Sequence, residues 1–316
     1  MKIAFFEIKQ EEKLFFQEHL PNQELFFFSQ TINEVLDKEY DYDAVSIFIH
    51  SKVSDEVLEK LPNLRYLQTR STGYEHIKCE MLYQRKILAS NVVGYGGPAV
   101  AEFAFSLLLN ATRKTNVALQ RSKKNNFTYH DLKGMELFSK CLGILGLGTI
   151  GSQMARIGKG FGMHLMAYSR TRTLIVDELG IDFSSNIEDV LRQSDILMIA
   201  LPLTSSTKNL LNERNMKEIK KETIIVNVAR GEIIEDSLYE KMENIFCLDV
   251  IHDTKYIGQK NLLYTPHMAY YTQEALIRIM QISLQNMEAF INAKALPNCL
   301  KFGCSRDYQI NKKESL

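Results

Sequence analysis

The apolar residues of this chain occur in short runs that alternate with amphipathic segments. In the first hundred residues, the runs at 2–7, 24–29, 44–49, 65–69 and 87–90 have the length and composition of buried strands. Helical patterns such as the one at 55–60 separate these runs. Strands that alternate with helices in this way predict a small parallel α/β domain.

A second block of the chain repeats this alternation. Apolar runs predict further strands at 141–145, 164–168, 196–200, 223–227 and 245–248. Residues 99–112 are apolar nearly all round, which predicts a buried helix, whereas 272–293 has its apolar residues on one face. We expect this last helix, which follows a completed sheet, to return to the first domain and make that domain discontinuous.

A glycine motif joins the first strand of the second block to its helix. Gly146, Gly148 and Gly151 form the pattern G-x-G-x-x-G, followed by a helical segment at 152–160 and the strand at 164–168. This context predicts a dinucleotide site: the first glycine turns sharply, the second lets a pyrophosphate approach, and the third allows close packing. A plain tight turn, the alternative, needs only one glycine. The chain is therefore expected to bind NAD or NADP.

Composition narrows the class of protein. The 316 residues are enough for two domains, and 38 basic residues balance 38 acidic ones, which argues against nucleic-acid or membrane-surface partners. The five cysteines (79, 141, 247, 299 and 304) have no metal-binding spacing, so we expect no metal and reduced thiols. With neither a signal-peptide core nor an apolar run of membrane length, the sequence favours a cytoplasmic protein.

Three polar residues of the second block follow apolar runs: two follow the predicted strands at 223–227 and 245–248, and the third follows a short run at 262–264. Arg230 could clamp a carboxylate, although an arginine in a surface ion pair is the more common case. His267, in Thr-Pro-His, could donate a proton near neutral pH, or it could be a structural histidine. Asp249 could equally be a turn residue. Ligands collect at the carboxyl edge of a parallel sheet, where all three would lie.

Together these segments resemble the D-isomer-specific 2-hydroxyacid dehydrogenase family, and within it the D-lactate and D-2-hydroxyisocaproate dehydrogenases. The matching blocks lie at 70–77, 95–102, 146–151, 201–207, 227–231, 248–250 and 265–267. The resemblance implies two doubly wound parallel-sheet domains, with a Rossmann dinucleotide-binding domain (98–269) inserted in a flavodoxin-like substrate domain (1–97 and 270–305). A tail follows at 306–316, and we expect a homodimer.

The resemblance also implies roles for particular residues. His267 would be the general acid and base, and Arg230 would bind the substrate carboxylate and keto oxygen. Thr72 and Gly73 would offer backbone N–H groups to the carboxylate, and Tyr95 and Tyr271 would form a compact, partly aromatic pocket. The remaining residues would bind the cofactor: Gly146, Gly148, Thr149, Ile150, Gly151, Ser169, Arg170, Leu201, Pro202, Thr207, Val228, Ala229 and Asp249.

The sequence departs from the family at two of these positions. The family pairs its histidine with a glutamate where this chain has Thr254, and the nearest acid is Asp253. Either Asp253 replaces that glutamate, which we favour, or the histidine works unpaired. Members specific for NAD usually carry an aspartate where this chain has Ser169, followed here by Arg170 and Arg172. Because a carboxylate would repel a 2′-phosphate and arginines attract one, NADP is favoured over NAD.

The predicted activity is reduction of a small 2-keto acid to a D-2-hydroxy acid, with a D-lactate-like substrate. Two alternatives stay open. One keeps the enzyme and changes the substrate to phosphoglycerate, glyoxylate or hydroxypyruvate. The other is a nucleotide-sensing binding protein without turnover.

Overall fold

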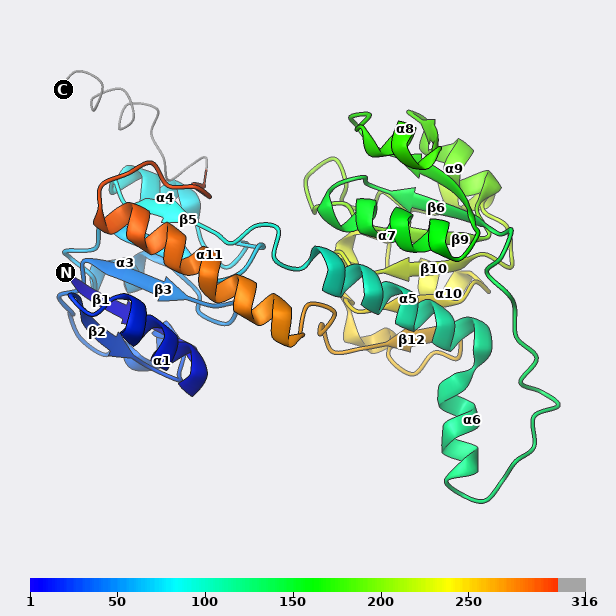
Figure 1. Cartoon of the computed structure of the whole chain (residues 1–316), viewed down its shortest axis with the longest axis horizontal. Helices are drawn as coiled ribbons and strands as arrows, with labels where there is room; N and C mark the ends of the chain where they lie inside the picture. The colour runs from blue at the N-terminus through cyan, green and yellow to red at the C-terminus, as the bar shows by residue number, and fades with distance from the viewer. Residues whose placement is uncertain (301–316) are drawn as a thin grey trace. The chain divides into compact units, whose positions relative to one another are not determined.

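The computed structural model describes residues 1–300 and divides the chain into two compact units. Unit 1 comprises Met1–Tyr95 and the chain from Gln273 onward, and unit 2 is Gly96–Thr272 (Figure 1). The tail expected at 306–316, and the last residues (301–305) of the first domain, lie outside the described residues.

Unit 1 is built on a five-stranded parallel sheet. Its strands are β1 (Lys2–Phe5), β2 (Glu24–Phe27), β3 (Ala44–Ile47), β4 (Tyr66–Thr69) and β5 (Leu88–Ser90). They lie in the order β2-β1-β3-β4-β5, which is the flavodoxin-like doubly wound order. The predicted fold class is confirmed for this unit, although β1, β2 and β3 end two residues before the apolar runs do, and β4 and β5 begin one residue after theirs.

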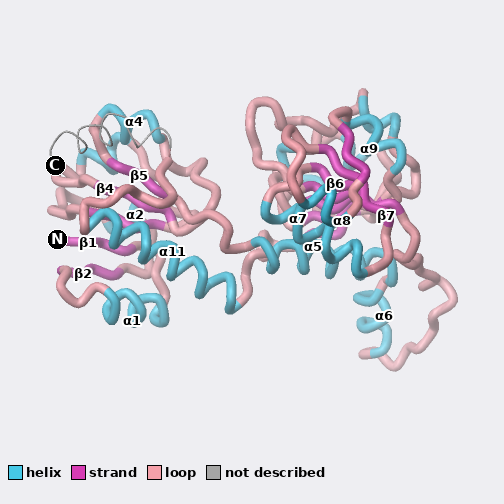
Figure 2. The backbone as a smooth tube through the Cα atoms, turned by 45° about the horizontal axis from the view of Figure 1, so that its top comes forward, coloured by secondary structure: helices cyan, strands magenta, loops and turns pink. Residues whose placement is uncertain are grey.

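Helices cover both faces of this sheet. They are α1 (Gln10–His19), α2 (Ile32–Val35), α3 (Asp55–Glu59), α4 (Cys79–Gln84) and α11 (Gln273–Ile291). The late helix α11 lies beside α1 over one face, where Phe290 stacks on the buried ring of Tyr66 with 4.6 Å between centroids (Figures 1 and 2). The apolar stripe of α11 is thus buried on the first sheet of the chain.

Unit 2 contains a seven-stranded parallel sheet. Its strands are β6 (Cys141–Leu145), β7 (His164–Tyr168), β8 (Asp182–Ser184), β9 (Ile196–Ile199), β10 (Ile224–Asn227), β11 (Phe246–Leu248) and β12 (Leu262–Tyr264). The strands lie in the order β12-β11-β10-β9-β6-β7-β8. Successive strands are added on one side of β6 up to β8 and on its other side from β9 onward, as in a Rossmann fold extended by one strand. The predicted Rossmann domain, inserted in the substrate domain, is confirmed.

The helices of unit 2 form two layers and one extension. Those on one face are α5 (Gly97–Arg113), α7 (Thr149–Gly160) and α8 (Ile175–Leu179), and α9 (Ile187–Gln193) and α10 (Leu238–Lys241) lie on the other (Figure 1). Helix α6 (Thr115–Ser122) has no buried residue and, with the segment that follows it, extends away from the sheet (Figure 1). Three short 3₁₀ turns, η1 (Asn215–Glu218), η2 (Gly231–Ile233) and η3 (Thr254–Tyr256), complete the unit.

Two observations bear on the class of protein. Within residues 1–300, no helix combines the length and the apolar character needed to cross a membrane. Cys79, Cys141 and Cys247 are free thiols, and burial raises the pKa of Cys247 to about 12. Cys299 is disulfide-bonded, which corrects the expectation of reduced thiols throughout; its position in the sequence carries no spacing motif that predicts a bond. Cys304 lies outside the described residues.

Candidate active site

Three neighbouring strands of unit 2 end together at one edge of the sheet. The last residues of β10, β11 and β12 are paired in register. Arg230, Asp249 and His267 follow these three strand ends within a few residues. The parallel topology therefore brings the three polar residues singled out from the sequence to the same carboxyl edge, where ligands bind in open α/β sheets.

Asp249 builds the turn that carries His267. Its fully buried carboxylate accepts hydrogen bonds from Thr265 Oγ1 at 2.7 Å, Met268 N at 2.9 Å and Ala269 N at 2.8 Å. The main-chain N–H of His267 donates to the Asp249 carbonyl at 2.9 Å. His267 has a φ of 53°, a conformation that residues other than glycine adopt only when their surroundings fix it. The positioning role of Asp249 was not predicted from the sequence.

Arg230 is held by the end of β10. The Asn227 side chain donates to the Arg230 carbonyl at 2.8 Å and accepts from the Ala229 N–H at 3.0 Å. The guanidinium is half-buried and donates to the Ala229 carbonyl at 2.8 Å. At Gly231 a Cβ atom would lie 2.5 Å from the main-chain nitrogen of His252, so this glycine lets the Arg230 loop lie against the loop after β11.

In the loop after β11, Asp253 pairs with Lys255, whereas a pairing with His267 was expected. Its carboxylate accepts from the Lys255 N–H at 3.0 Å and pairs with Lys255 Nζ at 3.0 Å, at the start of η3. These bonds to Lys255 lower the pKa of Asp253, so it is ionised at neutral pH. The adjacent His252 pairs with Asp236 at 2.8 Å, and this hydrogen bond raises the pKa of His252. Both carboxylate oxygens of Asp253 are thus in contact with Lys255.

The glycine turn has the shape that a dinucleotide pyrophosphate requires. Gly146 has a φ of 99° and no room for a side chain, since a Cβ would lie 2.9 Å from the Ala200 carbonyl oxygen. A Cβ at Gly151 would lie 1.8 Å from the Gly146 carbonyl oxygen. By contrast, nothing lies within 4 Å of a Cβ at Gly148, which is the N-cap of α7. Open space beside a helix N-terminus that begins with Thr149 and Ile150 fits a phosphate group.

The turn after β7 presents its two arginines differently. Ser169 is half-buried and Arg170 is exposed. Arg172 forms an ion pair with Asp177, and its guanidinium lies 5.9 Å from the ring centroid of Phe183. The charge on Arg172 is thus already matched by a carboxylate.

Other expected cofactor contacts lie on ordered loops of unit 2. Thr207 closes the loop after β9, because its hydroxyl donates to the Pro202 carbonyl at 2.6 Å and accepts from the Thr204 N–H at 2.7 Å. Leu201 is half-buried in this loop. Val228 is buried and Ala229 half-buried in the turn after β10.

Unit 1 carries the expected carboxylate-binding loop at its own carboxyl edge. The Thr72 hydroxyl donates to the Val92 carbonyl at 2.8 Å, Asn91 Nδ2 donates to the Thr72 carbonyl at 2.8 Å, and the Ser71 hydroxyl donates to the Gly73 carbonyl at 2.6 Å. Within the described chain, the N–H groups of Thr72 and Gly73 donate to no protein acceptor. Two fixed N–H donors suit a carboxylate.

The two tyrosines of the expected pocket belong to different units. Tyr95 lies in unit 1, where its carbonyl accepts from Arg278 Nε at 2.7 Å. Tyr271 lies in unit 2, with half of its surface exposed and its ring edge-to-face with Tyr270 at 6.1 Å between centroids.

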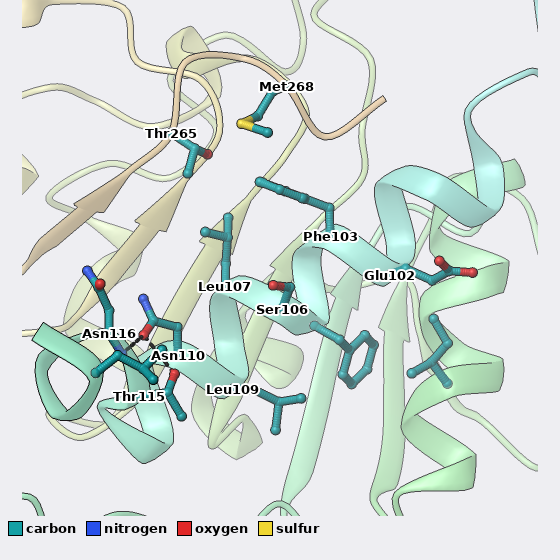
Figure 3. A pocket seen from close by; sticks show the side chains of 13 residues that line it. Glu102, Phe103, Ser106, Leu107, Leu109, Asn110, Thr115, Asn116, Thr265 and Met268 are labelled. Carbon is teal, nitrogen blue, oxygen red and sulfur yellow. Dashed lines mark hydrogen bonds between the residues drawn. The ribbon is translucent and has the colours of Figure 1, made fainter. Parts of the chain in front are cut away.

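A pocket of about 750 Å³ lies elsewhere in unit 2, along α5 (Figure 3). Side chains of α5 and α6 line it together with Thr265 and Met268, which flank the Pro266–His267 segment (Figure 3). On its floor, the Asn110 side chain accepts from the Thr115 hydroxyl at 3.0 Å and the Asn116 N–H at 2.9 Å, which joins α5 to the start of α6. None of the expected cofactor or catalytic residues lines this pocket.

Known proteins are similar to this chain in sequence and in fold. Residues 105–269 match the family model described as "D-isomer specific 2-hydroxyacid dehydrogenase, NAD binding domain". A glyoxylate reductase of Aeropyrum pernix is 34% identical over 84% of this chain and 84% of its own. A D-lactate dehydrogenase of Escherichia coli is 30% identical over 94% of this chain and 99% of its own.

Solved structures agree with these matches. The apo-structure of the Escherichia coli D-lactate dehydrogenase has a TM-score of 0.85 and covers 95% of this chain and 100% of that one, at 30% identity. The Aquifex aeolicus D-lactate dehydrogenase in complex with NAD and lactic acid has a TM-score of 0.84 at 27% identity, covering 96% of this chain and 100% of that one. The chain therefore belongs to the D-isomer-specific 2-hydroxyacid dehydrogenase family and is an NAD(P)-dependent enzyme of it.

Proposed function

We propose that this protein reduces a small 2-keto acid to the D-2-hydroxy acid. The observation that carries the proposal is the placement of Arg230 after β10 and of His267 after β12, two strands that flank β11, in a unit whose glycine turn fits a dinucleotide. Family membership makes a non-enzymatic nucleotide sensor the weaker alternative.

In this proposal each site residue has one task. Thr72 and Gly73 hold the substrate carboxylate through their N–H groups, and Arg230 binds the carboxylate and polarises the keto oxygen. His267 gives its proton to that oxygen as the carbonyl carbon accepts a hydride. Nicotinamide cofactors supply such a hydride when bound, and Gly148, Thr149 and Ile150, at the N-terminus of α7, would hold the pyrophosphate.

For the substrate, we propose a D-lactate-like acid with a small alkyl or aromatic side chain, which Tyr95 and Tyr271 would accommodate. Glyoxylate is a second candidate, because the Aeropyrum pernix relative of that name is 34% identical. A panel of pyruvate, longer keto acids, glyoxylate, hydroxypyruvate and phosphohydroxypyruvate tests both. His267→Ala should lower kcat on the best substrate by about 10²–10⁴ while cofactor binding is kept. No turnover with any of these acids would refute the proposal, and near-normal turnover in His267→Ala would exclude that residue.

For the cofactor, we propose a preference for NADP over NAD. The turn after β7 has Ser169 in place of an acid and the exposed Arg170, whereas Arg172 is paired with Asp177. NADPH should therefore give the higher kcat/KM, and Arg170→Ala should reduce kcat/KM with NADPH by about tenfold or more and with NADH much less, since only NADPH carries the 2′-phosphate. Arg172→Ala is the matched control. Equal losses with both cofactors in Arg170→Ala would show that this arginine does not recognise the phosphate.

We further propose a homodimer formed through α5, α6 and the segment after α6. The support is a group of exposed apolar side chains on this extension of unit 2 together with the open pocket beside it. Exposed apolar surface of this kind marks an interaction site in many soluble proteins.

A further inference from the structure

Glu7 stands at the carboxyl edge of the unit 1 sheet in an unusual conformation. It follows β1 within two residues and has a φ of 53°, a region that residues with a Cβ occupy at a cost. Its main chain is fixed on both sides: the N–H donates to the Gln30 carbonyl at 2.9 Å, and the carbonyl accepts from Arg70 Nη2 at 2.9 Å. Backbone strain that is held in this way occurs preferentially at functional sites.

The Glu7 carboxylate organises the loop that follows β3. Oε2 accepts the main-chain N–H groups of Phe48 at 3.1 Å and Ser51 at 3.0 Å, and Oε1 accepts that of His50 at 2.9 Å. These are hydrogen bonds to a charged acceptor, which are roughly twice as strong as neutral ones. The Glu7 side chain thus accepts three main-chain N–H groups of residues 48–51, which in a strand or helix would donate to main-chain carbonyls.

Arg70 ties Glu7 to the loop that follows β4. It is 1% exposed and directly precedes the Ser71–Gly73 segment. Its guanidinium donates to the Phe6 and Glu7 carbonyls at 2.9 Å. Burial lowers the pKa of Arg70, and the carboxylates of Glu12 and Glu7 act against this and favour the charged form. Glu7, which holds the loop after β3 through its carboxylate, is therefore bound through its main-chain carbonyl to Arg70, which begins the loop after β4.

The loops are also joined to each other. The Val53 N–H donates to the His76 carbonyl at 3.0 Å, and the Thr69 hydroxyl contacts the Ser71 hydroxyl at 2.6 Å and His76 Nε2 at 3.1 Å. The segment that carries the Thr72 and Gly73 N–H groups is consequently continuous, through hydrogen bonds, with the loop that Glu7 holds.

We propose that Glu7 is a positioning residue for the keto acid. It fixes residues 48–51 beside the Thr72 and Gly73 amides, and so determines how tightly and how selectively the substrate is held, without touching a reacting atom. This inference rests on the proposed function, because it takes these amides to be the carboxylate site.

Kinetics of Glu7→Ala and Glu7→Gln test the proposal, with Glu34→Gln as the matched control. Glu34 is a carboxylate of the same unit that also accepts a main-chain N–H, from Thr31 at 2.8 Å, but its hydrogen bonds go to Thr31 and not to residues 48–51 or 71–73. Glu7→Ala should raise KM for the best keto acid by about 10–100-fold, the usual effect of a misplaced binding group, and reduce discrimination between keto acids of different side-chain length. Glu7→Gln, which keeps one acceptor oxygen, should recover part of the loss, and kcat should change little in either variant.

Hydrogen exchange of the 48–51 amides gives a readout that does not depend on activity. Exchange should be faster in Glu7→Ala than in the wild type and in Glu34→Gln. A folded Glu7→Ala protein with unchanged KM and unchanged discrimination would overturn the proposal, as would a loss confined to kcat. If the wild type reduces no keto acid, the proposed function fails by itself, and unchanged exchange at 48–51 would then overturn the positioning role separately.

Discussion

The partner of His267, the proposed proton donor, is the open question at the scale of single residues. The family resemblance implies a glutamate where this chain has Thr254, and the neighbouring Asp253 pairs with Lys255. Its lowered pKa keeps Asp253 ionised across the pH range of an activity assay. If Asp253 moves to His267 during the reaction, Lys255 competes with the imidazolium for the same carboxylate.

This competition predicts opposite pH shifts in two variants. In the proposed mechanism, reduction of a keto acid needs the protonated form of His267, so the alkaline limb of the pH–rate profile should report the loss of that form. Asp253→Asn removes the stabilising charge and should move the limb to lower pH, whereas Lys255→Ala frees the carboxylate and should move it to higher pH, each by several tenths of a unit to about one unit. The double variant should behave as Asp253→Asn does. Unchanged profiles in both single variants would mean that Asp253 only caps η3.

At the scale of an element, the strand–turn–helix unit β6–α7 depends on a glycine that cannot carry a side chain. A Cβ at Gly151 would lie 1.8 Å from the carbonyl oxygen of Gly146. The positions of both atoms are fixed by the main chain, so no side-chain rotation can relieve the clash. Gly160 in the same helix has open space around its Cβ position. The two glycines therefore form a matched pair for testing the cofactor site.

Gly151→Ala should separate α7 from the turn and weaken cofactor binding strongly. We expect NAD(P)H affinity to fall by about 100-fold or more and the free energy of unfolding to fall by about 1–3 kcal/mol, as in other overpacked sites. Gly160→Ala should leave affinity unchanged and alter stability by at most about 1 kcal/mol in the favourable direction. Fluorescence titration and thermal unfolding measure both quantities. Equal affinities for the two variants would contradict the assigned role of the glycine turn.

The helices and strands differ in how well the sequence predicted them. Apolar runs located most of the strands of both sheets, because buried parallel strands need such runs. Helix α6 was not predicted, since none of its residues is buried and no apolar stripe marks it. The short edge strand β8 was also missed, because its residues are polar or only half-buried.

Some site residues were likewise predicted from the sequence and others were not. The sequence indicated Arg230, Asp249 and His267, because each follows a strand and matches a family block. No sequence pattern indicated Glu7, because the main-chain N–H groups that donate to its carboxylate lie more than 40 positions away in the chain. A local sequence pattern can identify a functional residue that directly follows its own strand. A residue that acts by holding a loop far away in the sequence can be identified only when the fold is known.

At the scale of the whole molecule, the extension formed by α6 and the segment after it is unusual for a free surface. Leu119 is 63% exposed, Phe127 74% and Tyr129 71%, and α6 buries none of its residues. Helix α6 is too short to be stable by its own propensity. Both facts are explained if a second copy of the chain covers this surface.

The homodimer proposal predicts that charges placed on this extension will separate the subunits. Leu119→Glu combined with Phe127→Glu should convert a dimer into a monomer at micromolar concentration, because a carboxylate buried in an apolar interface costs several kcal/mol. Leu14→Glu is the matched control, since Leu14 is also exposed (57%) but lies on α1 in unit 1. Sedimentation velocity distinguishes the two states, and the cofactor affinity of the monomer should be retained, because the glycine turn lies outside the substituted segment. A wild-type monomer, or a double variant that stays dimeric, would place the subunit contact elsewhere or remove it.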